Sequence, residues 1–200
     1  MKKVNPVVRL LTISDIFMLS AFGLISPILS IFYLRNIPGA GIETAGIAST
    51  IYLLTRSLFQ LPVAHLIDRI RGERDDIFVM VIGSFFTSLV PLCYIAAHST
   101  AHIYLIQFFY GLSQAMTYPS WLAIFTRHID RDKAGLEWGM YYTLTDLSGA
   151  TVAALGGIMA QKLGFAPLFV VVSIVSFFGA GWLLALRLEM DGEKKNKKVD

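Results

Sequence analysis

The 200-residue sequence is 55% hydrophobic and 16% charged, and its formal net charge at pH 7 is +3. Soluble domains contain about 45–50% apolar and about 25% charged residues, so this composition excludes an ordinary soluble domain. The charges gather in short clusters between long apolar stretches, and the small positive excess therefore indicates membrane topology rather than a nucleic-acid partner.

Six apolar stretches of about 20–27 residues follow one another, and each is long enough to cross a hydrocarbon core of about 30 Å. The first stretch carries Asp15 and has no small-x-small cleavage site, so we expect a retained helix rather than a signal peptide. The sequence therefore predicts an all-α polytopic membrane domain at residues 1–188 and a charged tail at residues 189–200. The six predicted transmembrane helices are residues 8–34, 43–67, 77–98, 102–126, 138–161 and 165–188.

Lysine and arginine are distributed unequally between the two sides of this predicted domain. Fourteen lie on the side that carries both termini, and only Arg35 and Lys162 lie on the other side. The positive-inside rule then predicts a multi-pass protein of the cell membrane with both termini in the cytoplasm. The short connections also permit a 3+3 inverted repeat, in which three helices are followed by three of opposite orientation.

Three ionisable residues lie well inside the predicted helices: Asp15, Arg56 and Asp146. At about 1.5 Å per residue, all three fall at a similar depth near the membrane midplane. An unpaired charge at that depth costs about 3 kcal/mol or more, so a charged partner or a water-filled cavity is expected. One interpretation is a substrate or proton site, and the other is a structural pair of Arg56 with one of the carboxylates.

The first and fourth predicted helices each carry polar and aromatic side chains at helical spacing. In the first, Gly23 and Pro27 are expected to loosen or bend the helix. These mixed faces suit the lining of a cavity for an amphipathic organic ligand, whereas interhelical hydrogen bonds and, for Trp121, a membrane-interface position are the alternatives. The candidate ligand-contacting residues on these two helices are Ser26, Gln107, Tyr110, Gln114 and Tyr118.

The fifth predicted helix has small residues at every fourth position, Gly149, Ala153 and Gly157, which indicates a close helix–helix contact. Asp146 lies three residues before Gly149, on the same face.

Elsewhere the sequence shows no metal-ligand spacing, nucleophile elbow or P-loop. We therefore expect no metal site, no cofactor and no enzymatic activity.

Three segments resemble signature segments of the major facilitator superfamily. In the fourth helix, Gly111, Ala115 and Pro119 follow the family's Gly-x-x-x-Ala-x-x-x-Pro rhythm, and Gln107 stands where the family often has an arginine. The glycine-rich fifth helix is similar as well, and so is the charged loop between the second and third helices. The residues that carry the loop resemblance are Ala64, Asp68, Arg69, Arg71, Gly72 and Arg74.

This resemblance implies a secondary active transporter that moves a small organic solute by rocker-switch alternating access. The family normally has twelve helices in two halves, so six helices imply a homodimer embedded in the lipid bilayer. The first and fourth helices would line the cavity, and the second and fifth would form the seam between the copies. The alternative is a non-transporting membrane subunit, or a half-transporter that pairs with a different partner.

The resemblance also implies roles for individual residues. Asp15 and Asp146 would bind a cationic substrate group or a coupling proton, and Arg56 would balance their charge. Asp68 would face the N-terminus of the fifth helix of a second copy, where a carboxylate favours the unpaired amides, and would latch the cytoplasmic side shut. The neighbouring arginines of the loop would meet Glu137 or Asp130 there.

Overall fold

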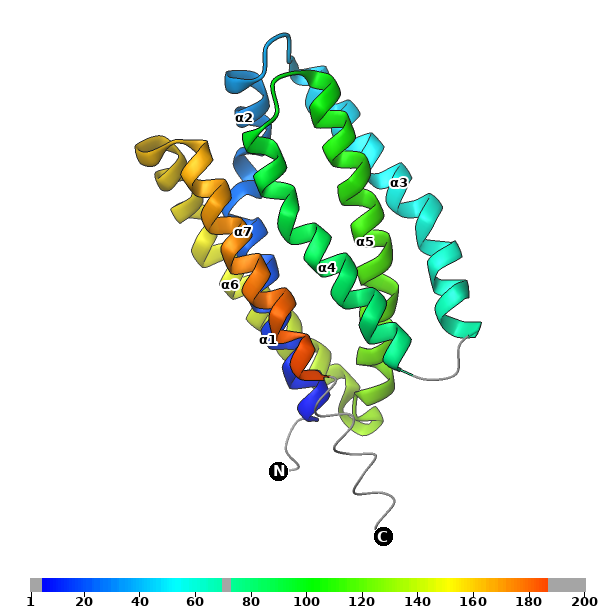
Figure 1. The fold of residues 1–200 in the computed structure, drawn as a ribbon. Helices are drawn as coiled ribbons and strands as arrows, with labels where there is room; N and C mark the ends of the chain where they lie inside the picture. Colours follow the sequence, from blue (N-terminus) through cyan, green and yellow to red (C-terminus); the bar gives the residue numbers. More distant parts are fainter. Residues whose placement is uncertain (1–4, 70–72, 187–200) are drawn as a thin grey trace.

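The computed structural model describes residues 5–69 and 73–186. Within these residues the chain forms six long helical rods (Figure 1) and no strand. Arg71 and Gly72 of the charged loop, and the predicted tail at residues 189–200, lie outside the described residues. The first rod consists of α1 (Pro6–Ile25), the 3-10 turn η1 (Ser26–Ile28) and α2 (Leu29–Asn36). The other rods are α3 (Ile42–Arg69), α4 (Arg74–Ile95), α5 (Thr100–His128), α6 (Ala134–Leu163), which the short turn η2 (Arg131–Lys133) precedes, and α7 (Phe165–Trp182).

Each rod overlaps one of the six predicted ranges, with ends that differ by a few residues. Among the described residues, four helical segments are long and apolar enough by composition to cross a membrane: Pro6–Asn36, Arg74–Ile95, Arg131–Leu163 and Phe165–Leu186. The helices α3 and α5 contain 28 and 29 residues, so they have sufficient length to span a membrane. They fall outside this group of four because polar side chains interrupt their apolar sequence.

The local sequence explains where several rods begin, bend and turn. The Asn5 side chain accepts a hydrogen bond of 2.8 Å from the backbone N–H of Val7. Pro6 is the first residue of α1, where a backbone N–H would have no partner within the helix, so its missing N–H costs nothing. Pro27 has no N–H to continue α1, so the backbone tightens into η1 before α2 resumes. Gly164, at a φ of 85°, turns the chain between α6 and α7 in a conformation that favours glycine.

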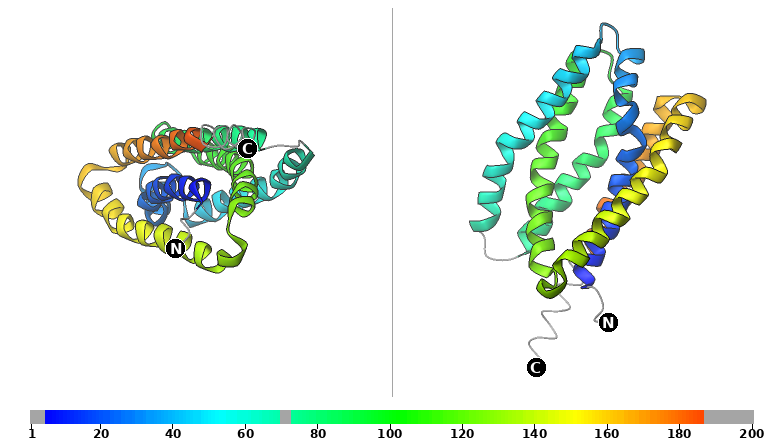
Figure 2. Two further views of the ribbon diagram at one scale, coloured as in Figure 1. Left: turned by 90° about the horizontal axis from the view of Figure 1, so that it is seen from below. Right: turned by 180° about the vertical axis from the view of Figure 1, so that it is seen from behind.

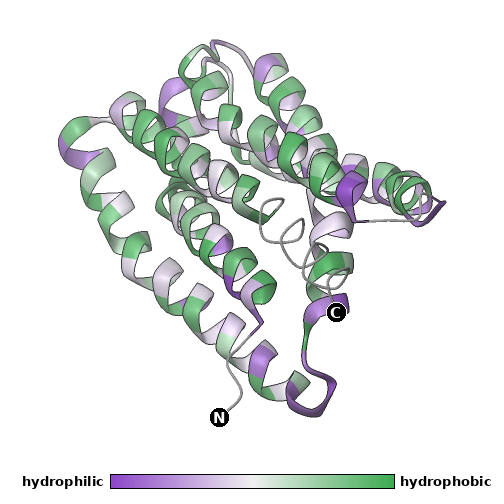
Figure 3. Cartoon of the chain, turned by 60° about the horizontal axis from the view of Figure 1, so that its bottom comes forward, coloured by the Kyte–Doolittle hydropathy of each residue, from purple (hydrophilic) through white to green (hydrophobic). Residues whose placement is uncertain are grey.

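Two helices, α1 and α5, hold central positions in the packing. The helix α1 packs against α6 and α7, while α5 packs against α3 and α4. A contact of α4 with α7 joins these two groups, and α3 and α6 lie on opposite flanks (Figure 2). Apolar residues cover much of the helices and hydrophilic residues gather near their ends and loops (Figure 3), a distribution that suits helices in a bilayer.

An aromatic core lies at the end of the bundle where α1 begins. The Trp121 ring stacks on Phe125 with 4.8 Å between ring centroids, and Trp138 lies 4.5 Å from Phe125 on the same measure. Trp121 is only 6% exposed, so the alternative that placed it at a membrane interface is wrong. A second core, which includes Phe32, joins α1, α2, α4, α5 and α7 towards the other end.

Glycines allow the closest approaches between helices. A Cβ atom at Gly111 of α5 would lie 2.6 Å from the backbone oxygen of Tyr52 in α3, and Ala115, one turn later, is fully buried. A Cβ atom at Gly156 of α6 would lie 1.8 Å from the backbone oxygen of Leu24 in α1. Both helix pairs therefore meet at distances that a larger side chain would prevent.

The contact face of α6 differs from the predicted stripe of small residues. A Cβ atom at Gly23 of α1 would lie 3.5 Å from the Cα atom of Gly149, so Gly149 does face α1. A Cβ atom at Gly157 would meet nothing within 4 Å, and the prediction of Gly157 as a packing residue is wrong for contacts within the chain. At 3.6 residues per turn, a spacing of seven returns to the same face while repeated spacings of four drift around the helix. The face that includes Gly149 and Gly156 therefore meets α1, and Ala153 lies at its edge.

Candidate functional site

Arg56 occupies the middle of α3, 14 residues after Ile42 and 13 residues before Arg69. Its Nη1 atom donates to the Tyr52 hydroxyl at 3.4 Å, and its guanidinium carbon lies 4.6 Å from the centroid of the Tyr118 ring. Tyr118 belongs to α5, so the guanidinium group bridges α3 and α5 by contact with an aromatic face. A cation over a tyrosine ring gains about 0.5–2 kcal/mol, depending on how far it is removed from water.

Aromatic rings from three helices lie next to this guanidinium group. Tyr52 of α3 stacks on Tyr110 of α5 with 4.7 Å between centroids. Tyr110 in turn stacks on Phe22 of α1, at 5.4 Å and with an interplanar angle of 8°. The Gln114 side chain, one turn after Tyr110 on α5, is close enough to interact with the Tyr110 hydroxyl. The rings therefore connect α1, α5 and α3 across the middle of the bundle.

We refer to these side chains together as the Arg56 face. All of them are at least partly exposed, so the face is open along the described chain. The structure thus brings together four of the predicted site residues, and it adds two aromatic residues that the sequence did not single out as ligand contacts. A guanidinium group and flat rings can bind a planar organic molecule that carries a hydrogen-bond acceptor. The Arg56 face consists of Phe22, Tyr52, Arg56, Tyr110, Gln114 and Tyr118.

Asp15 contacts a tyrosine hydroxyl and not Arg56, the partner that the sequence suggested for a structural ion pair. Its Oδ2 atom accepts a hydrogen bond of 2.8 Å from the Tyr141 hydroxyl, which joins α1 to α6. Among the described residues, neither Asp15 nor Asp146 lies within the 4.0 Å of Arg56 that defines an ion pair. The interpretation of a structural pair of Arg56 with a carboxylate is therefore wrong for this conformation.

The other predicted ligand contacts are spread over the molecule. Asp146 is exposed on α6, and Ser26 is exposed in η1. Gln107 is buried, and its Nε2 atom donates to the hydroxyls of Tyr33 at 3.0 Å and Tyr94 at 2.9 Å. These two bonds join α5 to α2 and α4 and use both amide hydrogens of Gln107, which matches the alternative of interhelical hydrogen bonding.

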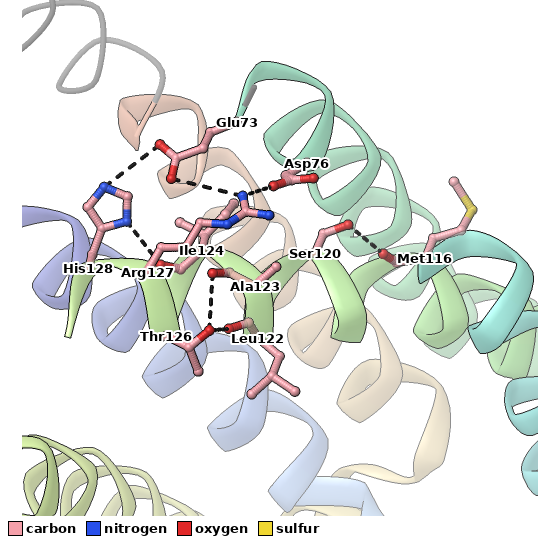
Figure 4. Close-up of polar contacts among 10 residues, drawn as sticks. All are labelled: Glu73, Asp76, Met116, Ser120, Leu122, Ala123, Ile124, Thr126, Arg127 and His128. Atoms are coloured by element: carbon pink, nitrogen blue, oxygen red, sulfur yellow. Dashed lines mark hydrogen bonds and ion pairs between the residues drawn. The ribbon is translucent and has the colours of Figure 1, made fainter. Parts of the chain in front are cut away.

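A cluster of ion pairs connects the end of α5 to the start of α4 (Figure 4). The Nη1 atom of Arg127 binds Oδ2 of Asp76 and lies 4.0 Å from a carboxylate oxygen of Glu73. His128 approaches the other oxygen of Glu73 at 3.8 Å through Nε2, while its Nδ1 lies 3.0 Å from the Ile124 carbonyl oxygen. The Asp76 side chain is fully buried, so Arg127 provides the charge that this carboxylate needs.

Sequence reasoning did not identify Arg127 or Tyr141 as partners of these carboxylates. A signal for the first was present, since Arg127 directly follows the fourth predicted helix and Asp76 directly precedes the third. Antiparallel neighbours place those two positions at the same level. No comparable signal existed for Tyr141, because its contact with Asp15 depends on how α6 is rotated against α1.

The residues predicted to form a latch are placed only in part. Asp68 and Arg69 are exposed at the end of α3, where Asp68 borders a hollow between α3 and α5 that Tyr118 and Pro119 also line. Glu137 is 7% exposed, and its Oε2 atom accepts a hydrogen bond of 3.3 Å from the backbone N–H of Asp130. The Glu137 carboxylate thus closes the connection between α5 and α6 within the chain, and the contact of loop arginines with Glu137 of a second copy stays a prediction.

Within the part of the chain that the structure describes, no group of three or more His, Cys, Asp and Glu side chains is arranged to hold a metal ion.

The sequence matches the family model described as Major Facilitator Superfamily over residues 11–200. No curated protein matches the sequence. The fold is similar to that in the "In meso crystal structure of the POT family transporter PepTSo", with a TM-score of 0.78 and 15% sequence identity. That similarity covers 92% of this chain and 38% of the other chain, so the present chain spans well under half of its length.

Proposed function

The chain belongs to the major facilitator superfamily, and from this membership we propose that it is a secondary active transporter of a small organic solute. The Arg56 face is the observation that carries the proposal. It combines a guanidinium group with aromatic rings at the middle of long helices, where a polar group is expected to meet a ligand or water. Polar chemistry at that depth is typical of a transport site.

A 3+3 inverted repeat is part of the proposal, and the helix packing supports it. In such a repeat the rod that begins with α1 corresponds to α5, α3 corresponds to α6, and α4 corresponds to α7. The contacts of α1 with α6 and α7 then become the contacts of α5 with α3 and α4, which are also present. The contact between α4 and α7 is unchanged by the exchange, whereas the smaller contact of α6 with α7 has no comparable counterpart between α3 and α4 in the described chain.

We propose that a second copy of the chain covers the Arg56 face. The face draws its side chains from α1, α3 and α5, and the two flanking helices α3 and α6 have large apolar side chains that are exposed along the described chain. The unequal distribution of Lys and Arg favours two copies with the same orientation in the membrane. The exposed apolar residues of the two helices include Leu54, Leu58, Leu61, Leu144, Leu147, Leu155 and Ile158.

Two such copies would work by rocker-switch alternating access around the covered face. Asp68 keeps its proposed role as a latch, because it is exposed at the end of α3 beside the hollow that α3 forms with α5. Asp15 is the proposed site for a coupling proton. Its carboxylate lies within a predicted transmembrane helix and is held by a single hydroxyl donor, so a change in its charge would alter the contact between α1 and α6.

Uptake into proteoliposomes tests this proposal. Solutes that raise the unfolding temperature of the purified chain in nanodiscs would be loaded into liposomes and tested for exchange against labelled solute outside. We expect at least one of them to exchange, and Asp15→Asn to abolish uptake driven by a proton gradient while exchange persists. No exchange of any stabilising solute would contradict transport and favour the alternative of a non-transporting subunit.

A further inference from the structure

The charge of Arg56 has no counter-ion among the described residues. An arginine side chain has five N–H donors, and the contacts of Arg56 consist of one hydrogen bond to Tyr52 and the face of the Tyr118 ring. The carboxylate of Asp15, which the sequence suggested as a partner, is instead bound by Tyr141. Most of the donors of Arg56 are therefore available to a ligand.

The position of Arg56 makes this lack of a partner costly. It lies at the middle of α3, and an arginine at the centre of a membrane costs about 2.5–3.5 kcal/mol even by insertion scales. The ring contact and one long hydrogen bond to a neutral hydroxyl offset only part of that cost. An anion that enters the face would offset the remainder, because the guanidinium group matches carboxylate and phosphate groups with two parallel hydrogen bonds.

The rings beside Arg56 indicate the shape of the rest of the ligand. Tyr52, Tyr110 and Phe22 are stacked in sequence away from the guanidinium group, and each is partly exposed. A flat apolar body can lie against such rings while its acidic group reaches Arg56. A cationic ligand would be repelled by Arg56 at the same place.

We propose that the Arg56 face binds an organic anion, namely a carboxylate or phosphate attached to a planar apolar body. This inference rests on the proposed transport function, and it names the substrate class of the same site. It replaces the expectation of a cationic substrate group that followed from the two aspartates, since Arg56 lies against Tyr52 and the Tyr118 ring while the Asp15 carboxylate is bound by Tyr141.

Binding of three matched probes to the chain in nanodiscs tests the inference. Naphthoate, naphthamide and naphthylmethylamine share a flat body and differ in charge, and equilibrium dialysis measures the Kd of each. We expect naphthoate to bind about tenfold or more tightly than naphthamide, because a hydrogen bond to a charged group is worth about 1.5–3 kcal/mol. Arg56→Gln should remove this preference, and Arg56→Lys should retain part of it.

The control variant Arg35→Gln removes the same charge at an exposed position in the last turn of α2 and should leave the preference unchanged. Thermal unfolding checks that each variant is folded, and Arg56→Lys keeps the test valid if Arg56→Gln does not fold.

Equal binding of the three probes, tighter binding of the amine, or a naphthoate preference that survives in Arg56→Gln would overturn the inference. Exchange of a cation in proteoliposomes, intact in Arg56→Gln, would overturn the anion site and keep transport. Arg56-dependent naphthoate binding without any exchange would contradict transport and keep the site.

Discussion

Replacing Gly156 by alanine should weaken the contact between α1 and α6, while the same replacement at Gly157 should not. The added Cβ atom at Gly156 would lie 1.8 Å from the Leu24 carbonyl oxygen and 2.6 Å from its carbon, both of which belong to the backbone. Ordinary contacts of a Cβ atom begin at 3.4 Å, so the two backbones must move apart. At Gly157 the added atom meets nothing within 4 Å.

The expected difference between the two variants follows from these distances. Forcing an extra carbon into a close-packed contact costs about 1–3 kcal/mol. Alanine in place of a helical glycine gains about 0.5–1 kcal/mol, and both variants share this gain. Gly156→Ala should therefore be less stable than Gly157→Ala by about 1–3 kcal/mol. For a chain of this length that difference lowers the midpoint of thermal unfolding by about 2–12 °C.

Tryptophan fluorescence during heating of the purified variants in one detergent measures both midpoints directly. Equal midpoints would show that α1 and α6 do not meet at Gly156 as described. A larger loss for Gly157→Ala would place the contact on the face that the spacing of Gly149, Ala153 and Gly157 predicts, and would refute the helix rotation found here.

Three further substitutions have expected outcomes. Gln107→Leu removes the donor shared by two buried tyrosine hydroxyls and should lower stability by about 1–3 kcal/mol, and an unchanged midpoint of thermal unfolding would rule out the cluster. Arg127→Gln leaves the buried Asp76 carboxylate without its charged partner and should also cost about 1–3 kcal/mol. Adding Asp76→Asn should restore part of that loss, and additive losses in a double-mutant cycle would argue against the pair. Asp68→Asn should shift the conformational balance toward the inward-open state, and cysteine accessibility labelling that matches the wild type would reject the latch.

The helix ranges are predictable from the sequence because long apolar stretches and charged ends determine them without reference to any neighbour. The Pro27 break in the first rod is predictable for the same reason, since a missing backbone N–H is a local property. Residues one or two turns apart on α5, such as Tyr110, Gln114 and Tyr118, also come together as their helical spacing predicts.

The contacts between helices are not predictable from spacing, because spacing does not determine which face of a helix meets which neighbour. A rotation of α6 by one residue would exchange Gly156 for Gly157 at α1 and would also move Tyr141 away from Asp15. Gln107 and Gln114 share one helical face by their spacing, yet Gln107 bonds to tyrosines of α2 and α4 while Gln114 interacts with Tyr110 of its own helix. Gln107 is therefore buried while Gln114 belongs to the open Arg56 face.

The copy number of the chain in a lipid nanodisc, measured by native mass spectrometry, tests most directly whether a second copy covers the Arg56 face. Two copies per disc are predicted, with retention of the dimer in mild detergent. Arg56 would then face a shared cavity rather than lipid. A single copy under all lipid and detergent conditions would contradict the account, because the guanidinium group and the exposed apolar sides of α3 and α6 would have no second chain to cover them.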